Sequence, residues 1–108
     1  MSDRFIKGKK IARKQRESEI EKKVTQHAKK NKWLSYKWVS PSQRGVPDRL
    51  YFKDGKVKII EFKAPGKAPT GGQRLIHKSL ERCGFPVHVV DNVEKGVELF
   101  EKDEGCDP

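Results

Sequence analysis

The chain has 108 residues, of which 33% are hydrophobic and 37% are charged, and its formal net charge is +10 at pH 7. This length suits one compact domain, and the low apolar share predicts that part of the chain lies outside the core. The positive charge predicts an anionic partner, most commonly nucleic acid, with an anionic membrane surface as the main rival. No apolar stretch approaches the roughly 20 residues that a spanning helix needs, so we expect no membrane insertion.

The N-terminal residues are basic and no apolar block follows them, so we expect no secretory signal peptide. The chain has two cysteines, Cys83 and Cys106. They do not make a disulfide framework, and they lack metal-ligand spacing with the three histidines. Reduced thiols in a cytoplasmic protein are therefore expected.

Residues 1–16 form a basic segment with a single acid, Asp3, which predicts a flexible N-terminal arm. A solubilising tail, a DNA-contacting arm, a helix extension and a dimer contact are all compatible with it. The spacing of Ile20, Val24 and Ala28 then predicts an amphipathic helix over 17–31.

The centre of the expected fold is a set of strands. The segment 33–39 alternates like a strand, with Leu34, Tyr36 and Trp38 on one face, and 40–45 interrupts regular structure. Two further strands, 49–52 and 56–63, flank the dipeptide Asp54-Gly55, which is a strong signal for a hairpin turn.

After a loop over 64–72, a helix is expected from Gln73 to Cys83, with Gly84 as its left-handed cap. Residues 87–90 read as a buried strand, and the order strand, helix, strand predicts that it runs parallel to the strand 56–63. A final helix is expected over 93–100. The predicted organisation is thus an arm over 1–16, one domain over 17–100 and a polar tail over 101–108.

Three charged residues fall where this fold predicts a chemical site. Glu61 and Lys63 are two apart on a strand and therefore project to the same face. The expected hairpin brings Asp48, at the start of its first strand, toward Glu61 at the end of its second. Taken singly, Asp48 is compatible with a turn residue after proline, and Glu61 and Lys63 with an exposed strand pair.

Two neighbouring carboxylates repel each other unless a cation joins them. A hard divalent ion such as Mg²⁺ solves this, because it needs only one or two protein carboxylates and completes its shell with water and phosphate oxygens. Lys63 beside such a site can stabilise charge on a phosphate or orient the attacking water.

These residues resemble a known family. The motifs are Gly45-Val46-Pro47-Asp48, the run from Glu61 to Gly66, Gln73, and the run from Gly84 to Val87. Together they are similar to the VRR-NUC domain, a branch of the PD-(D/E)XK nuclease superfamily, over about 17–100. The short stand-alone members that the chain resembles are phage proteins.

The resemblance implies a single α/β/α, restriction-endonuclease-like core with a mixed central sheet. It also implies hydrolysis of DNA phosphodiester bonds with Mg²⁺ or Mn²⁺, without an organic cofactor. Branched DNA such as a four-way junction would be the substrate, the protein would act as a homodimer, and the location would be the cytoplasm of a bacterial or phage-infected host cell.

By the same resemblance, Asp48 and Glu61 would bind the metal, with the main-chain carbonyl of Phe62 as a further ligand. Lys63 would be the catalytic lysine, and Gln73 would hydrogen-bond the lysine, a water or a phosphate. The family also has an acid on its first helix. Glu21 is the match that we predict, and Glu17, one turn earlier on nearly the same face, stays open.

The basic residues nearest these motifs are predicted DNA contacts: Arg44 before the first acid, Lys67 after the lysine, and Arg74 at the start of the second helix, whose amides could also receive a phosphate. Each is also compatible with a solvated surface charge. Trp33, Tyr36 and Trp38 could stack on bases, although aromatic side chains on a strand more often pack in a core.

Two other functions are compatible with the sequence. A non-catalytic basic nucleic-acid-binding protein would need only the positive charge. It would have no use for two acids and a lysine aimed at a phosphate. A sequence-specific restriction enzyme on the same core would need recognition insertions for which 108 residues leave little room.

Overall fold

The computed structural model describes the chain from Arg16 to Glu104, with side chains as far as Glu101. Three helices and four strands follow one another in the order α1 (Glu17–Lys30), β1 (Leu34–Lys37), β2 (Arg49–Lys53), β3 (Lys56–Phe62), α2 (Gly71–Arg82), β4 (Val87–Val90) and α3 (Val93–Glu104). The predicted basic arm, apart from Arg16, and Cys106 lie outside the described residues.

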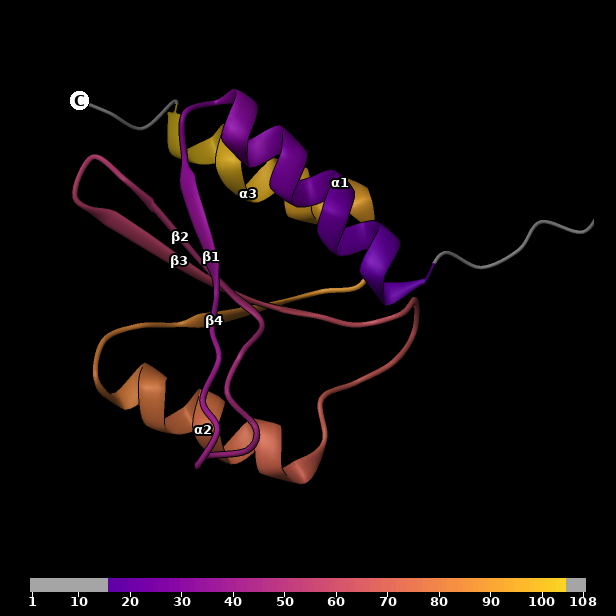
Figure 1. The fold of residues 1–108 in the computed structure, drawn as a ribbon, viewed down its shortest axis with the longest axis vertical. Coiled ribbons are helices and arrows are strands. Elements are labelled where there is room, and N and C mark those ends of the chain that lie inside the picture. The colour runs from indigo at the N-terminus through magenta and orange to yellow at the C-terminus, as the bar shows by residue number, and fades with distance from the viewer. Residues whose placement is uncertain (1–15, 105–108) are drawn as a thin grey trace, which may run out of the picture.

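The four strands form one sheet in the order β1-β2-β3-β4. The pairs β1–β2 and β2–β3 are antiparallel, and β3 and β4 are parallel. Helices α1 and α3 lie side by side on one face of the sheet, and α2 lies on the other (Figure 1). The predicted α/β/α architecture with a mixed sheet is therefore confirmed, as is the parallel crossover to β4.

The turn between β2 and β3 has the backbone that its sequence predicts. Asp54 and Gly55 have φ angles of 48° and 76°. Positive φ at both central residues is typical of a type I′ turn, whose twist matches that of the flanking strands. This turn fixes the register Arg49↔Ile60, and with it the position of every residue at the opposite end of the hairpin.

The main core lies between the sheet and the pair α1/α3. Phe100 packs edge-on against the rings of Trp33 and Tyr51, with centroid distances of 5.1 and 5.0 Å. The buried Tyr51 hydroxyl and Thr25 Oγ1 form a hydrogen bond of 2.7 Å, which fixes α1 on the sheet. Burying such aromatic side chains is a major source of stability. This core therefore supports the sheet, whose other face carries α2.

Gly96 lets α3 approach this core closely. A Cβ atom placed on it would lie 2.5 Å from Val24 Cγ2 and 3.1 Å from Val90 Cγ1. No side chain fits there without movement of the helix.

The ends of two helices differ from the sequence prediction. The helix expected from Gln73 begins at Gly71, because Thr70 acts as its N-cap and accepts the Gln73 N–H at 3.2 Å. The spacing Thr70-x-x-Gln73 is a capping box, and this signal was overlooked. The last helix continues past the expected end at Phe100 to Glu104. In the described part of the chain no helix is long and apolar enough to cross a membrane.

The sheet face beneath α2 is covered only in part. The register aligns apolar residues of β1, β2 and β3 in two rows on this face, namely Leu34, Phe52 and Val57, and Tyr36, Leu50 and Ile59. The main strand contact of α2 is with β4, at the other edge of the sheet. Leu34 and Tyr36 are consequently 59% and 60% exposed.

Candidate functional site

Asp48 stands one residue before β2, and the hairpin fixes it in place. Its N–H donates to the carbonyl of Ile60 at 3.1 Å, which extends the β2–β3 pairing by one residue. Its carboxylate Oδ2 accepts the Phe62 N–H at 2.7 Å. A carboxylate that accepts a main-chain N–H at this distance is firmly oriented, so Asp48 is held at the end of β3 beside Glu61.

The loop before Asp48 explains why this segment contains Gly45. Its φ is +90°, and a Cβ atom there would lie 3.0 Å from the Gly72 carbonyl oxygen. Both the positive φ and the close approach favour glycine. Since the following Pro47 is fully buried, the loop is anchored between the first turn of α2 and the strand that presents Asp48.

Glu61 is 1% exposed, which is rare for a carboxylate. Its Oε2 accepts a hydrogen bond of 2.8 Å from Gln73 Nε2 on α2. The other end of the Gln73 amide, Oε1, accepts the Thr70 N–H at 2.9 Å as part of the capping box. The N-terminal cap of α2 therefore orients the amide that holds Glu61.

Lys63 completes the cluster. Its N–H donates to the Val90 carbonyl at 2.9 Å, so the end of the sheet also holds this residue. Its Nζ lies 3.6 Å from Glu61 Oε2, and its side chain is only 14% exposed. The structure thus places Asp48, Glu61, Lys63 and Gln73 together at one end of β3.

The electrostatics of the cluster favour an added cation. Burial and, secondarily, the charge of Asp48 raise the pKa of Glu61 to about 7, against the opposing effect of Lys63. Burial likewise raises the pKa of Asp48, although the hydrogen bond from Phe62 opposes this. Two neighbouring carboxylates whose charged forms are disfavoured, with a single lysine acting on both, favour the binding of a further cation.

Helix α1 brings two acids near this cluster. Glu21 Oε2 pairs with Arg49 Nε at 2.7 Å and with Lys37 Nζ at 3.9 Å, so cations of the sheet already compensate its charge. Burial and the charge of Asp48 raise the pKa of Glu17, and Lys63 lowers it. Within the described part of the chain, Glu17 thus lies in the field of the cluster and has no ion pair like that of Glu21.

The donor set fits a hard divalent ion. Glu61 Oε1 is buried and has no hydrogen-bond partner in the described part of the chain. Between Arg16 and Glu101, no three acid, histidine or cysteine side chains converge into a closed metal cage. Two carboxylates with space for further oxygen ligands are the protein contribution that Mg²⁺ usually takes.

Known proteins share both the sequence and the fold. The "Putative nuclease p44" of Acyrthosiphon pisum secondary endosymbiont phage 1 is 44% identical over 78 residues, which are 71% of this chain and 84% of that protein. The chain belongs to the family of this phage protein. A solved structure described as a VRR_NUC domain superposes with a TM-score of 0.73 at 23% identity, over 79% of this chain and 94% of that one. The expected VRR-NUC fold is thereby confirmed. No protein-family model matches the chain.

The three predicted DNA contacts are exposed on segments next to those of the cluster. Arg44 belongs to the loop that packs on the first turn of α2, Lys67 to the loop after β3, and Arg74 to α2 itself. They are exposed positive charges on segments that adjoin those carrying the cluster. The predicted Phe62 carbonyl ligand belongs to a residue whose side chain is buried in the main core and whose N–H holds Asp48.

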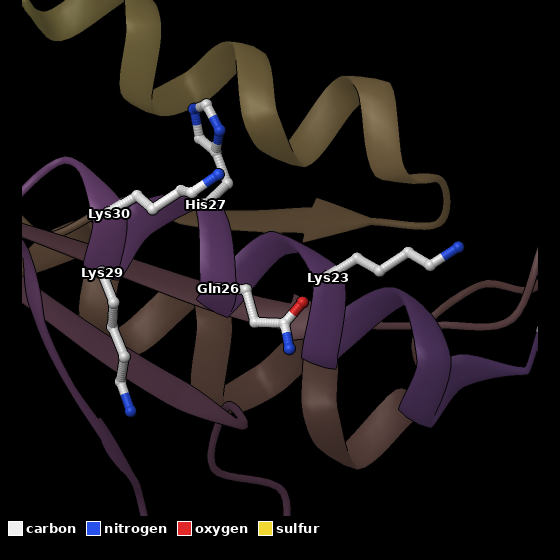
Figure 2. A pocket seen from close by; sticks show the side chains of 5 residues that line it. All are labelled: Lys23, Gln26, His27, Lys29 and Lys30. Atoms are coloured by element: carbon white, nitrogen blue, oxygen red, sulfur yellow. The ribbon is translucent and has the colours of Figure 1, made fainter.

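One hollow of the surface lies away from these acids. Lys23, Gln26, His27, Lys29 and Lys30 of α1 line it. Their side chains point in different directions (Figure 2), so they do not converge on a ligand. The candidate site of two acids and a lysine therefore lies at the end of β3 and not in this hollow.

Sequence reasoning missed His77 and Arg49. His77 follows Gln73 by one helical turn, is 7% exposed, and has Nε2 3.8 Å from Glu61 Oε1. Its i, i+4 spacing from Gln73 was the available signal. Arg49, which holds Glu21 and also donates to Ser35 Oγ at 3.0 Å, follows Asp48 directly, but only the sheet register shows which acid it meets.

Proposed function

We propose that this protein is a metal-dependent DNA endonuclease. The observation that carries the proposal is the convergence of Asp48, Glu61 and Lys63 at one end of β3, with Lys63 Nζ 3.6 Å from Glu61 Oε2. Two desolvated acids and a lysine suit the hydrolysis of an anionic ester. The name of the phage relative, a nuclease, and the VRR-NUC fold support the same reaction class.

The carboxylates of Asp48 and Glu61 would hold Mg²⁺ or Mn²⁺, and the carbonyl of Phe62 is a further candidate ligand. When bound, such an ion would supply Lewis-acid stabilisation of the phosphate and a more acidic water. The unpartnered Oε1 of Glu61 and the raised pKa values of both acids support this assignment.

Residues of the chain itself would orient the two acids and neutralise charge on the phosphate. The Phe62 N–H fixes Asp48, and Gln73 fixes Glu61, so neither acid has to reorganise when DNA arrives. Lys63 would contact the phosphate and stabilise its developing negative charge. Gln73 would act as a positioning residue through Glu61.

Between the two acids of α1, the environment favours Glu17 as the one that contributes to the site. Glu21 is committed to Arg49 by an ion pair of 2.7 Å. Burial and then the charge of Asp48 raise the pKa of Glu17, while Lys63 lowers it. Our sequence prediction chose Glu21, so a comparison of the two single variants decides between them.

DNA binding would rest on phosphate contacts. The net charge of +10 supports a polyanionic substrate, and Arg44, Lys67 and Arg74 are exposed cations around the acids. No element of the described fold resembles a helix that reads the major groove, and phosphate contacts alone do not read sequence. We therefore propose selection by DNA structure, with four-way junctions and other branched DNA as the preferred class.

We further propose a homodimer that forms through the apolar face of the hairpin sheet. On this face β1, β2 and β3 present no charged side chain in the rows of Leu34 and Tyr36, whereas their lysines lie on the opposite face. A chain of charge +10 repels its own copy least where it carries no charge, and these two rows contain no cation that would attract DNA. The second copy is therefore the occupant that fits.

The dimer is tested by the mass of the full chain in solution. Analytical ultracentrifugation is expected to give a dimer for the natural protein and a monomer for Tyr36→Lys. Gln26→Lys is the control, because Gln26 is exposed on α1, which covers the opposite face of the sheet (Figure 1). A monomeric natural protein, or a dimer that withstands Tyr36→Lys and Leu34→Lys together, would contradict the proposed interface.

The activity is tested with a panel of end-labelled linear duplex, flap, splayed-arm and four-way junction DNA. The purified full chain is incubated with each in Mg²⁺, Mn²⁺ or EDTA. Cutting of branched DNA that requires the metal is expected, with cut positions near the branch. Tight, salt-sensitive binding without any cutting would instead favour a non-catalytic nucleic-acid-binding protein.

A further inference from the structure

Two buried polar atoms face each other beside the cluster, and neither has a hydrogen-bond partner among the residues that the structure describes. They are His77 Nε2 and Glu61 Oε1, 3.8 Å apart. His77 is 7% exposed and Glu61 1% exposed. Leaving a buried polar atom unsatisfied costs about 1–3 kcal/mol, so two such atoms at this separation need an explanation.

The chemistry of the two atoms is complementary. A neutral imidazole carries one N–H, on Nδ1 or on Nε2, and a carboxylate oxygen accepts. An N–H···O bond has a length of about 2.9 Å, so a movement of less than about 1 Å would form one here.

The helix supports this geometry. Gln73 and His77 are four residues apart and therefore project from one face of α2. Gln73 already donates to Glu61 Oε2 at 2.8 Å, and His77 lies opposite the other oxygen. A single helix thus presents one donor to each oxygen of the same carboxylate.

We infer that His77 is a positioning residue for Glu61, with its Nε2–H donating to Oε1 and Gln73 donating to Oε2. Two donors fix the plane of a carboxylate, whereas a single donor leaves the carboxylate free to rotate about its Cγ–Cδ bond. Each oxygen has a second lone pair, so a ligand role of Glu61 is preserved. The hydrogen bond stands on the geometry alone, while its consequence for metal affinity rests on the proposed function.

The hydrogen bond is tested first, in the metal-free full chain at about pH 9, where Glu61, whose pKa is raised to about 7, is ionised and can only accept. Long-range ¹H–¹⁵N NMR distinguishes the two neutral tautomers of His77, and the tautomer with the proton on Nε2 is expected. The Nδ1–H tautomer would overturn the inference, because Nε2 could then only accept. This measurement requires neither metal binding nor cleavage.

The consequence is tested by calorimetric titration with Mn²⁺. His77→Leu, which fills the space without a donor, is expected to weaken Mn²⁺ binding by roughly 10- to 100-fold, as loss of an outer hydrogen bond to a metal ligand typically does. His77→Gln, whose amide reaches about as far as Nε2, is expected to recover most of the affinity. Ser79→Ala, on an exposed position of the same helix, is the control.

The outcomes separate the two proposals. Equal Mn²⁺ affinities of the His77→Leu and His77→Gln variants, with melting temperatures recorded for both, would reduce His77 to a packing residue and overturn the inference. Absence of Mn²⁺ binding by the natural protein would remove the proposed metal function. The tautomer of His77 would still decide whether the histidine holds Glu61.

Discussion

The amide of Gln73 connects the cap of a helix with the buried carboxylate of Glu61. Its Oε1 accepts the Thr70 N–H at 2.9 Å, and its Nε2 donates to Glu61 Oε2 at 2.8 Å. A residue that stabilises the start of α2 thereby also orients an acid on β3. Secondary structure and site geometry are coupled through one side chain.

This coupling predicts opposite effects of two substitutions. Gln73→Glu keeps an oxygen for the cap but replaces the donor with a negative charge beside Glu61, so cleavage is expected to fall steeply with little loss of helix. Thr70→Ala removes the cap at a cost of about 1 kcal/mol but leaves the amide in place. Cleavage rates and thermal melts of both variants check this. Similar cleavage by the two would refute the role given to the amide.

The raised pKa of Glu61 predicts a pH-dependent cost in the metal-free protein. The folded state prefers the protonated acid, so this contribution to stability is present below the ordinary pKa of 4.5 and is lost as the pH rises through about 7. In EDTA, Glu61→Gln is therefore expected to be more stable than the natural protein at pH 8, by on the order of 2 kcal/mol, with the difference vanishing near pH 4.

Urea unfolding across this pH range measures the difference directly. Burial lowers the pKa values of His77 and His88, which gives the free energy of unfolding a pH dependence of the opposite sign. Both proteins contain these histidines, so their contributions cancel in the difference. A difference in stability that does not change with pH would show that Glu61 titrates normally.

The two acids of α1 are expected to behave differently. Glu21→Gln breaks the part-buried ion pair with Arg49 and is expected to cost about 1 kcal/mol of stability, with cleavage largely kept. Glu17→Gln is expected to leave stability within about 0.5 kcal/mol, as exposed substitutions usually do, but to lower cleavage. Melting temperatures and cleavage rates of the two variants decide, and the reverse pattern would restore Glu21 as the functional acid.

Much of this arrangement could be predicted from the sequence, because local rules determine it. The dipeptide Asp54-Gly55 set the hairpin, the hairpin brought Asp48 to Glu61, and the strand period put Lys63 on the same face. The rotation of α2 could not be predicted, since it depends on how the loop after Lys63 and the segment of Gly45 pack. For that reason His77 was overlooked.

The choice between Glu17 and Glu21 was open for a similar reason. The two acids are one turn apart and have nearly the same direction on α1. What separates them is Arg49, whose reach across the sheet to Glu21 is a tertiary contact.

Gly96→Ala is expected to lower the stability of the protein, although helix propensity alone predicts that it would raise it. Replacing an exposed helical glycine with alanine stabilises by about 1 kcal/mol. At Gly96 the added methyl group would lie 2.5 Å from Val24 Cγ2, so Gly96→Ala is expected to cost about 1–3 kcal/mol. Gly71→Ala is the control, because no atom lies within 4 Å of its Cβ position. Chemical denaturation of both variants measures the effect, and a stabilising Gly96→Ala would contradict the close approach of α3.

The central claim is that Asp48 and Glu61 form a metal-dependent centre for cutting DNA. Its most direct test measures cleavage of a labelled four-way junction in Mg²⁺ by the natural full chain and by Asp48→Asn, with junction binding measured in Ca²⁺. Cleavage by the natural chain, none by Asp48→Asn, and similar binding by both are predicted. Undiminished Mg²⁺-dependent cleavage by Asp48→Asn would contradict the account.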